Sequence, residues 1–271
     1  MNTLITVFVF LIGLCIGSFL NVVIYRYNTG RGVNGRSGCM HCGKTLAWYE
    51  LIPVISFLVQ RGRCSSCASK LSWQYPLVES TTALLFTATF LKYIHTPFNL
   101  ITILSLGIAL VSWCLLVVIV VYDFKHKIIP NGIVYTFALL GLLHVFISVP
   151  VASTVTFYTA LFAGPILFLP FFILWFVSDG RWIGLGDAKL ALGIGWMLGL
   201  GLGLSAIVLA FWIGSVLSIC FMIFLRLKLN GKNLTMKSEI PFAPYLILGF
   251  TIVYFLSIDV LGLEAVLKNL L

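Results

Sequence analysis

Charged residues are scarce in this chain, and acidic residues are the scarcest among them. Only 9% of its 271 residues are charged and only 8 are Asp or Glu, whereas a soluble domain has roughly 25% charged residues. Several apolar runs reach the roughly 20 residues that a helix needs to cross a bilayer. This composition excludes a soluble globular protein. It also excludes an outer-membrane barrel, whose strands alternate apolar and polar residues instead of forming uniform apolar runs.

The apolar runs predict an all-α polytopic membrane protein with about eight transmembrane helices. The first run lacks the basic N-terminal flank of a cleaved signal peptide and is too long for one, so we expect a retained helix. We predict three domains, which are a first transmembrane helix (1–24), a small polar region (25–75) and a seven-helix membrane domain (76–271). The expected spans are residues 4–24, 76–94, 100–122, 132–147, 157–177, 188–202, 204–225 and 244–258.

The basic residues predict how the chain is oriented. If all eight spans cross, 15 of the 17 Lys and Arg residues fall on the side of the polar region 25–75, and only Lys92 and Lys268 fall on the other. Basic loops stay in the cytoplasm, so we expect the polar region on the cytoplasmic side of a bacterial inner membrane. The net charge of +9 then has a topological explanation, and no nucleic-acid partner is expected.

Four of the seven cysteines form two C-x-x-C pairs that are separated by 21 residues. This spacing is typical of four thiolates around one zinc ion. Disulfides are disfavoured in the reducing cytoplasm, and a redox C-x-x-C usually sits at a helix start in a βαβ setting that is missing here. Four sulfur ligands leave no open coordination position, so the zinc is expected to be structural. His41 is expected to face solvent. The predicted ligands are Cys39, Cys42, Cys64 and Cys67.

Two aspartates stand at the predicted cytoplasmic edge of the membrane. Asp123 ends the third span, and Asp187 follows the glycines Gly184 and Gly186 at the start of the sixth. Charged groups at membrane depth are costly and usually functional. Two carboxyl groups brought close together share one proton, so one can activate a water while the other polarises a carbonyl. The pair therefore predicts an acid/base couple that hydrolyses a peptide bond at the membrane surface.

The surroundings of Asp187 support this assignment. Gly184 and Gly186 are expected to let the backbone turn sharply and a substrate main chain approach, and the helix dipole at the start of the sixth span favours a charged carboxylate. Taken alone, however, either aspartate is more often an interfacial anchor or a helix cap than a catalyst. A multi-spanning transporter or a membrane scaffold with a zinc module is the alternative. A transporter would favour mid-span charges, broken helices and an internal repeat, and we find charges only at the edges.

Glycines recur every four residues along the sixth expected span and directly after it, at Gly195, Gly199 and Gly203. Such spacing lets two helix backbones approach closely. We expect this packing to be internal rather than a dimer interface.

Several segments taken together resemble one known family. They are residues 17–26 (GSFLNVVIYR), 48–56 (WYELIPVIS) between the two cysteine pairs, 75–79 (YPLVE), 184–189 (GLGDAK) around Asp187, and 240–244 (IPFAP), together with Asp123. In this combination they resemble the type IV prepilin peptidases, also called leader peptidase/N-methyltransferase, of the GxGD-type aspartic membrane proteases. The resemblance covers almost the whole chain.

Two positions depart from the pattern of this family. The family commonly has Pro-Asp after the first catalytic aspartate, whereas this chain has Pro130-Asn131, which makes Asp123 the expected catalytic residue of that loop. Glycine often follows the second cysteine pair, whereas Ala68 stands there. We expect this change to cost little for zinc binding.

The resemblance implies two activities. One is removal of the basic leader from type IV prepilins or pseudopilins of pilus or type II secretion systems, with Asp123 and Asp187 catalytic and Gly184, Gly186 and Lys189 as supporting motif residues. The other is N-methylation of the new amino terminus with S-adenosyl-L-methionine. The sequence has no recognisable nucleotide-binding fingerprint, so methylation is implied by the resemblance alone, and the first span with its cytoplasmic loop is expected to carry it.

Two further acidic residues fall on the same membrane edge. Glu79 begins the second span, and Glu239 precedes the segment 240–244. Both are candidates for binding the basic leader.

Overall fold

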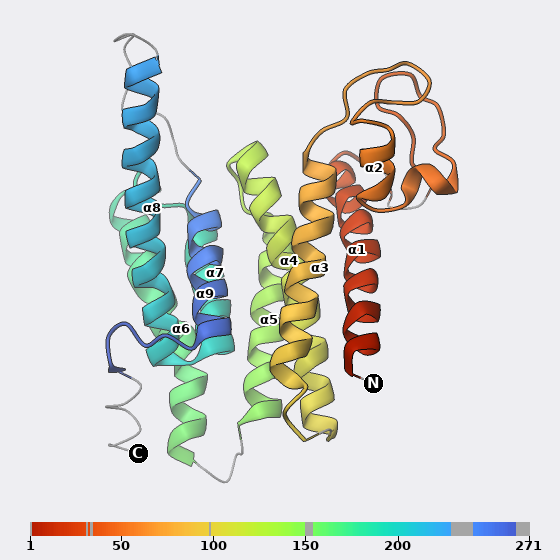
Figure 1. Cartoon of the computed structure of the whole chain (residues 1–271). Helices are drawn as coiled ribbons and strands as arrows, with labels where there is room; N and C mark the ends of the chain where they lie inside the picture. Colours follow the sequence, from red (N-terminus) through yellow and green to blue (C-terminus); the bar gives the residue numbers. More distant parts are fainter. Residues whose placement is uncertain are drawn as a thin grey trace. The chain divides into compact units, whose positions relative to one another are not determined.

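The computed structural model describes residues 2–30, 32, 35–97, 99–149, 154–228 and 241–263. Within these ranges the chain is helical and has no strand (Figure 1). The elements are α1 (Asn2–Arg26), η1 (Trp48–Leu51), α2 (Ile55–Val59), α3 (Gln74–Tyr93), α4 (Leu100–His126), α5 (Asn131–Ser148), α6 (Thr154–Val177), α7 (Leu185–Leu198), α8 (Leu200–Lys228) and α9 (Ala243–Leu256).

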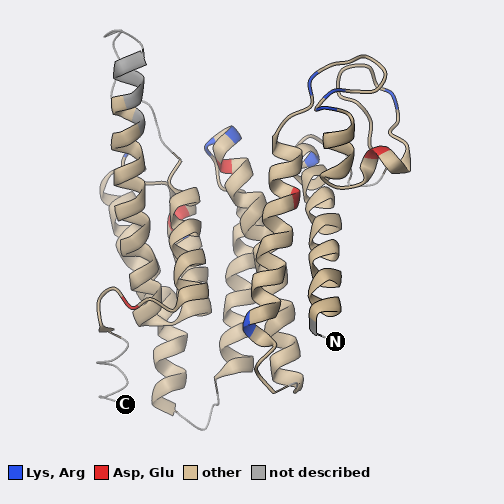
Figure 2. Cartoon of the chain, viewed as in Figure 1, with Lys and Arg blue, Asp and Glu red and all other residues tan. Residues whose placement is uncertain are grey.

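The predicted all-α membrane fold is confirmed, and its eight expected spans correspond one by one to α1 and α3–α9. Five of these helices, α1, α4, α5, α6 and α8, are long and apolar enough to cross a membrane. The helices α7 and α9 have 14 residues each, which is about 21 Å at about 1.5 Å per residue and shorter than a hydrocarbon core of about 30 Å. Figure 2 shows how few charged residues interrupt the helices.

The sixth expected span ends earlier than predicted. Gly199 stops α7 with a φ of +80°, a left-handed conformation that favours glycine, and α8 begins at the next residue. The three evenly spaced glycines therefore do not share one helix, since Gly195 is in α7, Gly199 is its C-cap and Gly203 is in α8. Gly195 packs against Ala163 and Gly164 of α6, where a side chain would approach their backbone to 2.6–2.8 Å. The expected internal packing is confirmed for this glycine.

The chain divides into two compact units, Met1–Val118 and Ile119–Leu271. In the first unit α1 packs along α3. Gly13 and Gly17 allow this approach, because a Cβ at either position would come within 2.6 Å of the backbone of Ala83 or Glu79, respectively. The region between α1 and α3 carries the cysteine pairs and the short helices η1 and α2.

In the second unit α7 is the central helix and contacts α5, α6, α8 and α9. Its residues Leu190, Ala191 and Ile194 have no exposed surface. A helix with many small, apolar side chains can occupy this central position, because the backbones of the neighbouring helices can approach it closely. The packing fixes the start of α7, which carries Asp187, relative to the helices around it.

Candidate active site

Asp123 lies near the end of α4 and is buried, with 5% of its surface exposed. The backbone N–H of Ala243, at the first position of α9, donates a hydrogen bond to its carboxylate. The Oδ2 atom is also buried and has no hydrogen-bond partner among the described residues. Buried polar atoms are normally paired, so this free acceptor marks the carboxylate as a place where another polar group can bind.

Asp187 occupies the third position of α7, and its side chain is also buried. Its carboxylate accepts a hydrogen bond from the backbone N–H of Gly184, the N-cap residue. This is one half of a capping box, in which an acidic residue at the third helical position reaches back to the N-cap amide. The predicted location at the helix start is therefore confirmed, and the local sequence alone holds the carboxylate in place.

The two carboxylates interact electrostatically, although they come from helices that are far apart in the sequence. Both belong to the second unit. No hydrogen bond joins them to each other in the described part of the chain, and each accepts a hydrogen bond from a backbone N–H. Backbone amides therefore hold both carboxylates within one compact unit.

Of the two glycines that precede Asp187, Gly186 is the one that the packing around the site requires. A Cβ at this position would lie 2.8 Å from Cβ and 3.0 Å from Cδ1 of Ile129, in the loop between α4 and α5. A Cβ at Gly184 would meet nothing closer than 3.5 Å, at Oδ2 of Asp187. Neither residue has a positive φ. The expected conformational freedom is thus not used, and Gly186 instead provides space for the loop that follows Asp123.

Lys189 connects the start of α7 to the start of α5. Its Nζ donates a hydrogen bond of 2.7 Å to Oδ1 of Asn131 and lies 4.7 Å from the ring centroid of Tyr135. The position at which the family resemblance led us to expect Asp therefore still accepts a hydrogen bond, without the negative charge. Lys189 therefore links α7 to α5. Among the described residues it makes no hydrogen bond to either aspartate.

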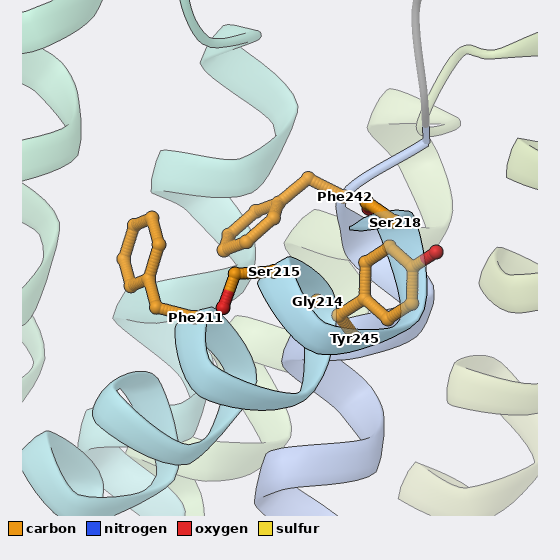
Figure 3. Close-up of a pocket in the computed structure, with 6 residues that line it drawn as sticks. All are labelled: Phe211, Gly214, Ser215, Ser218, Phe242 and Tyr245. Atoms are coloured by element: carbon orange, nitrogen blue, oxygen red, sulfur yellow. The ribbon is translucent and has the colours of Figure 1, made fainter. Parts of the chain in front are cut away.

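An aromatic cluster positions the start of α9. Phe242, one residue before Ala243, packs against Phe211 of α8 with ring centroids 4.9 Å apart, and Phe171 of α6 lies 6.2–6.3 Å from both. Beside it is an open cavity of about 250 Å³ between α8 and the start of α9 (Figure 3). The cluster holds the backbone whose N–H contacts Asp123. The cavity is lined by Phe211, Gly214, Ser215, Ser218, Phe242 and Tyr245.

The four predicted cysteine ligands come together in the first unit. The Sγ atoms of Cys39, Cys42, Cys64 and Cys67 all lie within 4.8 Å of one another, an arrangement that can hold one metal ion. The two pairs have the same local structure, since each is closed by one isolated bridge, Gly38 with Thr45 and Arg63 with Lys70. His41 is exposed, as expected.

Each knuckle turns through a residue in the left-handed region directly after its second cysteine. These residues are Gly43, with a φ of +72°, and Ala68, with a φ of +54°. A residue with a Cβ is strained in this conformation. The alanine therefore has a conformational cost that the sequence alone did not reveal.

Glu50 joins the two knuckles, and sequence reasoning did not assign it this function. It is buried and accepts hydrogen bonds from Ser65, which follows Cys64, from Lys44, at 3.0 Å, and from the backbone N–H of Ala47. The bond from Ser65 is the largest cause that lowers its pKa to about 2. Glu50 is the only acidic residue in the region 25–75, and this isolation between two cysteine pairs is the signal that sequence reasoning missed.

The remaining acidic residues lie in different surroundings. Glu79 is buried in α3 and accepts a hydrogen bond from the backbone of Val54. Asp179 is exposed in the turn after α6. Glu239 lies outside the described residues.

Comparisons with known proteins agree with this geometry. The model of the bacterial peptidase A24 N-terminal domain matches residues 11–93, and the model of the type IV leader peptidase family matches residues 108–223. Three proteins named prepilin leader peptidase/N-methyltransferase are similar to the chain. The protein of Bacillus subtilis is 31% identical over 90% of this chain and 92% of its own length, and that of Pseudomonas aeruginosa is 30% identical over 87% and 85%.

The third, from Myxococcus xanthus, is 38% identical over 71% of this chain, and the match spans only 56% of its own length. No solved structure matches the chain significantly. The two family models cover both cysteine pairs and both aspartates. The chain belongs to the type IV leader peptidase family.

Proposed function

We propose that this chain is a prepilin peptidase that removes the leader of type IV prepilins or pseudopilins and then methylates the new amino terminus. Its family membership and the names of its full-length relatives support both activities. The observation that carries the peptidase assignment is the pair of buried, electrostatically interacting carboxylates of Asp123 and Asp187.

The pair supplies general acid and general base catalysis. One carboxylate accepts a proton from the attacking water, and the protonated carboxyl donates to the carbonyl oxygen of the scissile peptide bond. A shared proton meets both needs, because two adjacent carboxyl groups do not readily ionise together. The free Oδ2 of Asp123 is the acceptor that supports a bound water. The backbone amides of Ala243 and Gly184 each donate a hydrogen bond to one of the two carboxylates and limit its movement.

Three further residues support the pair without contacting the reacting atoms. Gly186 allows the loop after Asp123 to reach the start of α7, and Lys189 ties that start to α5. Gly184 supplies the N-cap amide that holds Asp187. We therefore assign all three as positioning residues.

We propose that the cysteine cluster holds a structural zinc ion. A tetrahedral ion with metal–sulfur distances of about 2.3 Å places its ligand sulfurs about 3.8 Å apart, and the Sγ atoms of Cys39 and Cys67 lie 3.8 Å apart. The four thiolates would be its ligands, and the ion would crosslink the two knuckles. With all four coordination positions occupied by sulfur, we assign it no part in the hydrolysis.

Methyl transfer requires S-adenosyl-L-methionine, which supplies the methyl group. The names of the relatives support this activity, and we propose that the region 25–75 takes part in it. We propose the domain boundaries in the same way, as a first helix (1–24), the zinc region (25–75) and a peptidase membrane domain (76–271).

We further propose that the protein lies in the bacterial inner membrane with the zinc region and both aspartates on the cytoplasmic side. The distribution of basic residues supports this orientation, since the cytoplasmic side of a membrane protein is enriched in Lys and Arg. The basic leader of a prepilin would then be bound and cleaved on the cytoplasmic side, where the prepilin is synthesised.

Co-expression with a prepilin tests the proposed function. We expect the mature pilin to lose its leader and to gain the mass of one methyl group at its new amino terminus, as measured by mass spectrometry of the N-terminal peptide. Unprocessed prepilin beside correctly inserted protein would contradict the peptidase assignment. Processed but unmethylated pilin would contradict only the transferase assignment.

A further inference from the structure

Within the otherwise polar region between α1 and α3, one segment presents an apolar surface. On α2, Ile55, Leu58 and Val59 are exposed, the last with 76% of its surface accessible. Their spacing places them on one face of the helix. On η1, which contacts α2, Trp48 is exposed by 78% and Tyr49 by 56%. We call the segment from Trp48 to Val59 the η1–α2 segment.

The opposite face of α2 is anchored to its own unit. Phe57 is buried, packs against Trp73 with ring centroids 5.0 Å apart, and lies where a Cβ on Gly62 would meet its ring at 3.1 Å. The exposed apolar residues of α2 are therefore not core residues of this unit, because Phe57 of the same helix already packs into its core.

A hydrogen bond fixes how deep the segment lies along the transmembrane helices. The backbone N–H of Val54, directly before α2, donates a bond of 2.7 Å to Oε2 of Glu79. Glu79 is the sixth residue of α3, and its backbone lies against Gly17 of α1. Gly17 is nine residues before the end of α1 at Arg26, which is about 13 Å along the helix at about 1.5 Å per residue. The start of α2 thus lies beside the last turns of α1, a helix that can span the membrane, and Figure 1 shows α2 next to that end of α1.

The exposed apolar surface continues from α2 onto α3. Trp73, which packs on Phe57, is itself exposed, and Leu77 and Leu84 follow it at helical spacing on the same face of α3. The exposed apolar surfaces of α2 and α3 are continuous, so both face the same medium. We infer that this side of α3 faces lipid, because α3 packs along α1, a helix that can span the membrane, and that the same medium covers α2.

The chemistry of the segment suits the boundary between headgroups and acyl chains. Trp and Tyr concentrate at this level of the membrane, and short amphipathic helices lie there with their apolar face toward the acyl chains. Arg61, Arg63 and Lys70 are exposed in the loop that follows α2, and basic residues close to the surface attract anionic headgroups.

We propose that the η1–α2 segment is an interfacial membrane anchor that rests on anionic phospholipid. The apolar face of α2 enters the outer part of the acyl layer, and the basic residues behind it contact phosphate groups. The anchor keeps the cysteine cluster at the membrane surface. This inference is independent of the proposed catalytic pair.

Photo-crosslinking in native membranes tests the anchor. A benzophenone amino acid replaces Val59, and in a second variant Leu58, in the full-length protein. A variant at Leu84 on α3 is the lipid-facing control, and one at Thr45, an exposed residue of the same region, is the solvent-facing control. After irradiation, the intact mass of the purified protein reports phospholipid adducts.

We expect lipid adducts at positions 59 and 58 in yields within about threefold of position 84, and at least about tenfold above position 45. Yields at 59 and 58 that equal the yield at 45, or adducts to another protein instead of to lipid, would overturn the proposal. A lipid yield that does not fall when Arg61 and Arg63 are both replaced by Gln would contradict the headgroup contact.

Discussion

Replacing Gly186 with Ala adds one methyl group at the closest contact around Asp187. The new Cβ would lie 2.8 Å from Cβ of Ile129, whereas carbon atoms in good contact are about 3.5–4.0 Å apart. The two segments must therefore separate by about 0.7 Å or more. Overpacking of this kind typically costs about 1–3 kcal/mol.

The effect on catalysis should be larger than the effect on stability. A displacement of about 1 Å at a catalytic group can cost about 100-fold in rate, and the methyl group pushes on the element that carries Asp187. We expect Gly186→Ala to lower the rate of leader cleavage by about 100-fold. Gly184→Ala adds a methyl group with no contact closer than 3.5 Å. It should cost about 1 kcal/mol as a poorer N-cap and only a few-fold in rate.

The assay is cleavage of a purified prepilin by detergent-solubilised protein at equal amounts of each variant. A double variant, Gly186→Ala with Ile129→Gly, removes the atom that the new methyl group meets and should recover at least about tenfold of the loss. Equal rates for the two single alanine variants would refute the reasoning. So would a double variant no more active than Gly186→Ala alone.

Three further predictions concern the supporting contacts. Ala68→Gly should relieve a left-handed alanine and stabilise the cysteine region by about 1 kcal/mol, measured as slower release of zinc to a chelator. Lys189→Met should lower the free energy of unfolding of the membrane domain by at most about 1 kcal/mol, because the charged hydrogen bond that it removes is exposed to solvent, whereas Asn131→Asp, which introduces an ion pair, should leave it unchanged or raise it. Because the pKa of Glu50 is lowered to about 2, its stabilising contribution should be complete above its ordinary value of about 4.3 and disappear as the pH falls toward 2. The stability difference between wild type and Glu50→Gln should therefore be constant from pH 8 to 5 in thermal unfolding; a difference that shrinks within that range would contradict the assignment.

The positions of the long helices were predictable because each is an apolar run bounded by polar or turn residues. The break between α7 and α8 was also predicted, but it lies at Gly199 instead of at residue 203, because the run of glycines and leucines around it does not mark where the first helix ends. The short helix α2 was missed. Five residues carry too little periodicity to distinguish a helix from a loop, and its position depends on a bond to Glu79 that is 25 residues away.

The candidate site was predictable in its residues but not in its contacts. Asp123 and Asp187 stand out because so few acids lie at the membrane edge, and the cysteine pairs stand out by their spacing. The reason for Gly186 is an approach of Ile129 from another segment, and the function of Glu50 depends on Ser65 from the second knuckle. Both depend on tertiary packing, which local sequence patterns do not encode.

Exchange of each catalytic carboxyl for an amide tests the central claim most directly. Asp123→Asn and Asp187→Asn are each co-expressed with a prepilin, with Asp179→Asn, an exposed acid of the loop after α6, as the matched control. Mass spectrometry of the pilin then reports the leader. We predict mature pilin with wild type and the control, and only full-length prepilin with either amide variant although both insert at normal levels. Normal processing by either one would contradict a catalytic pair.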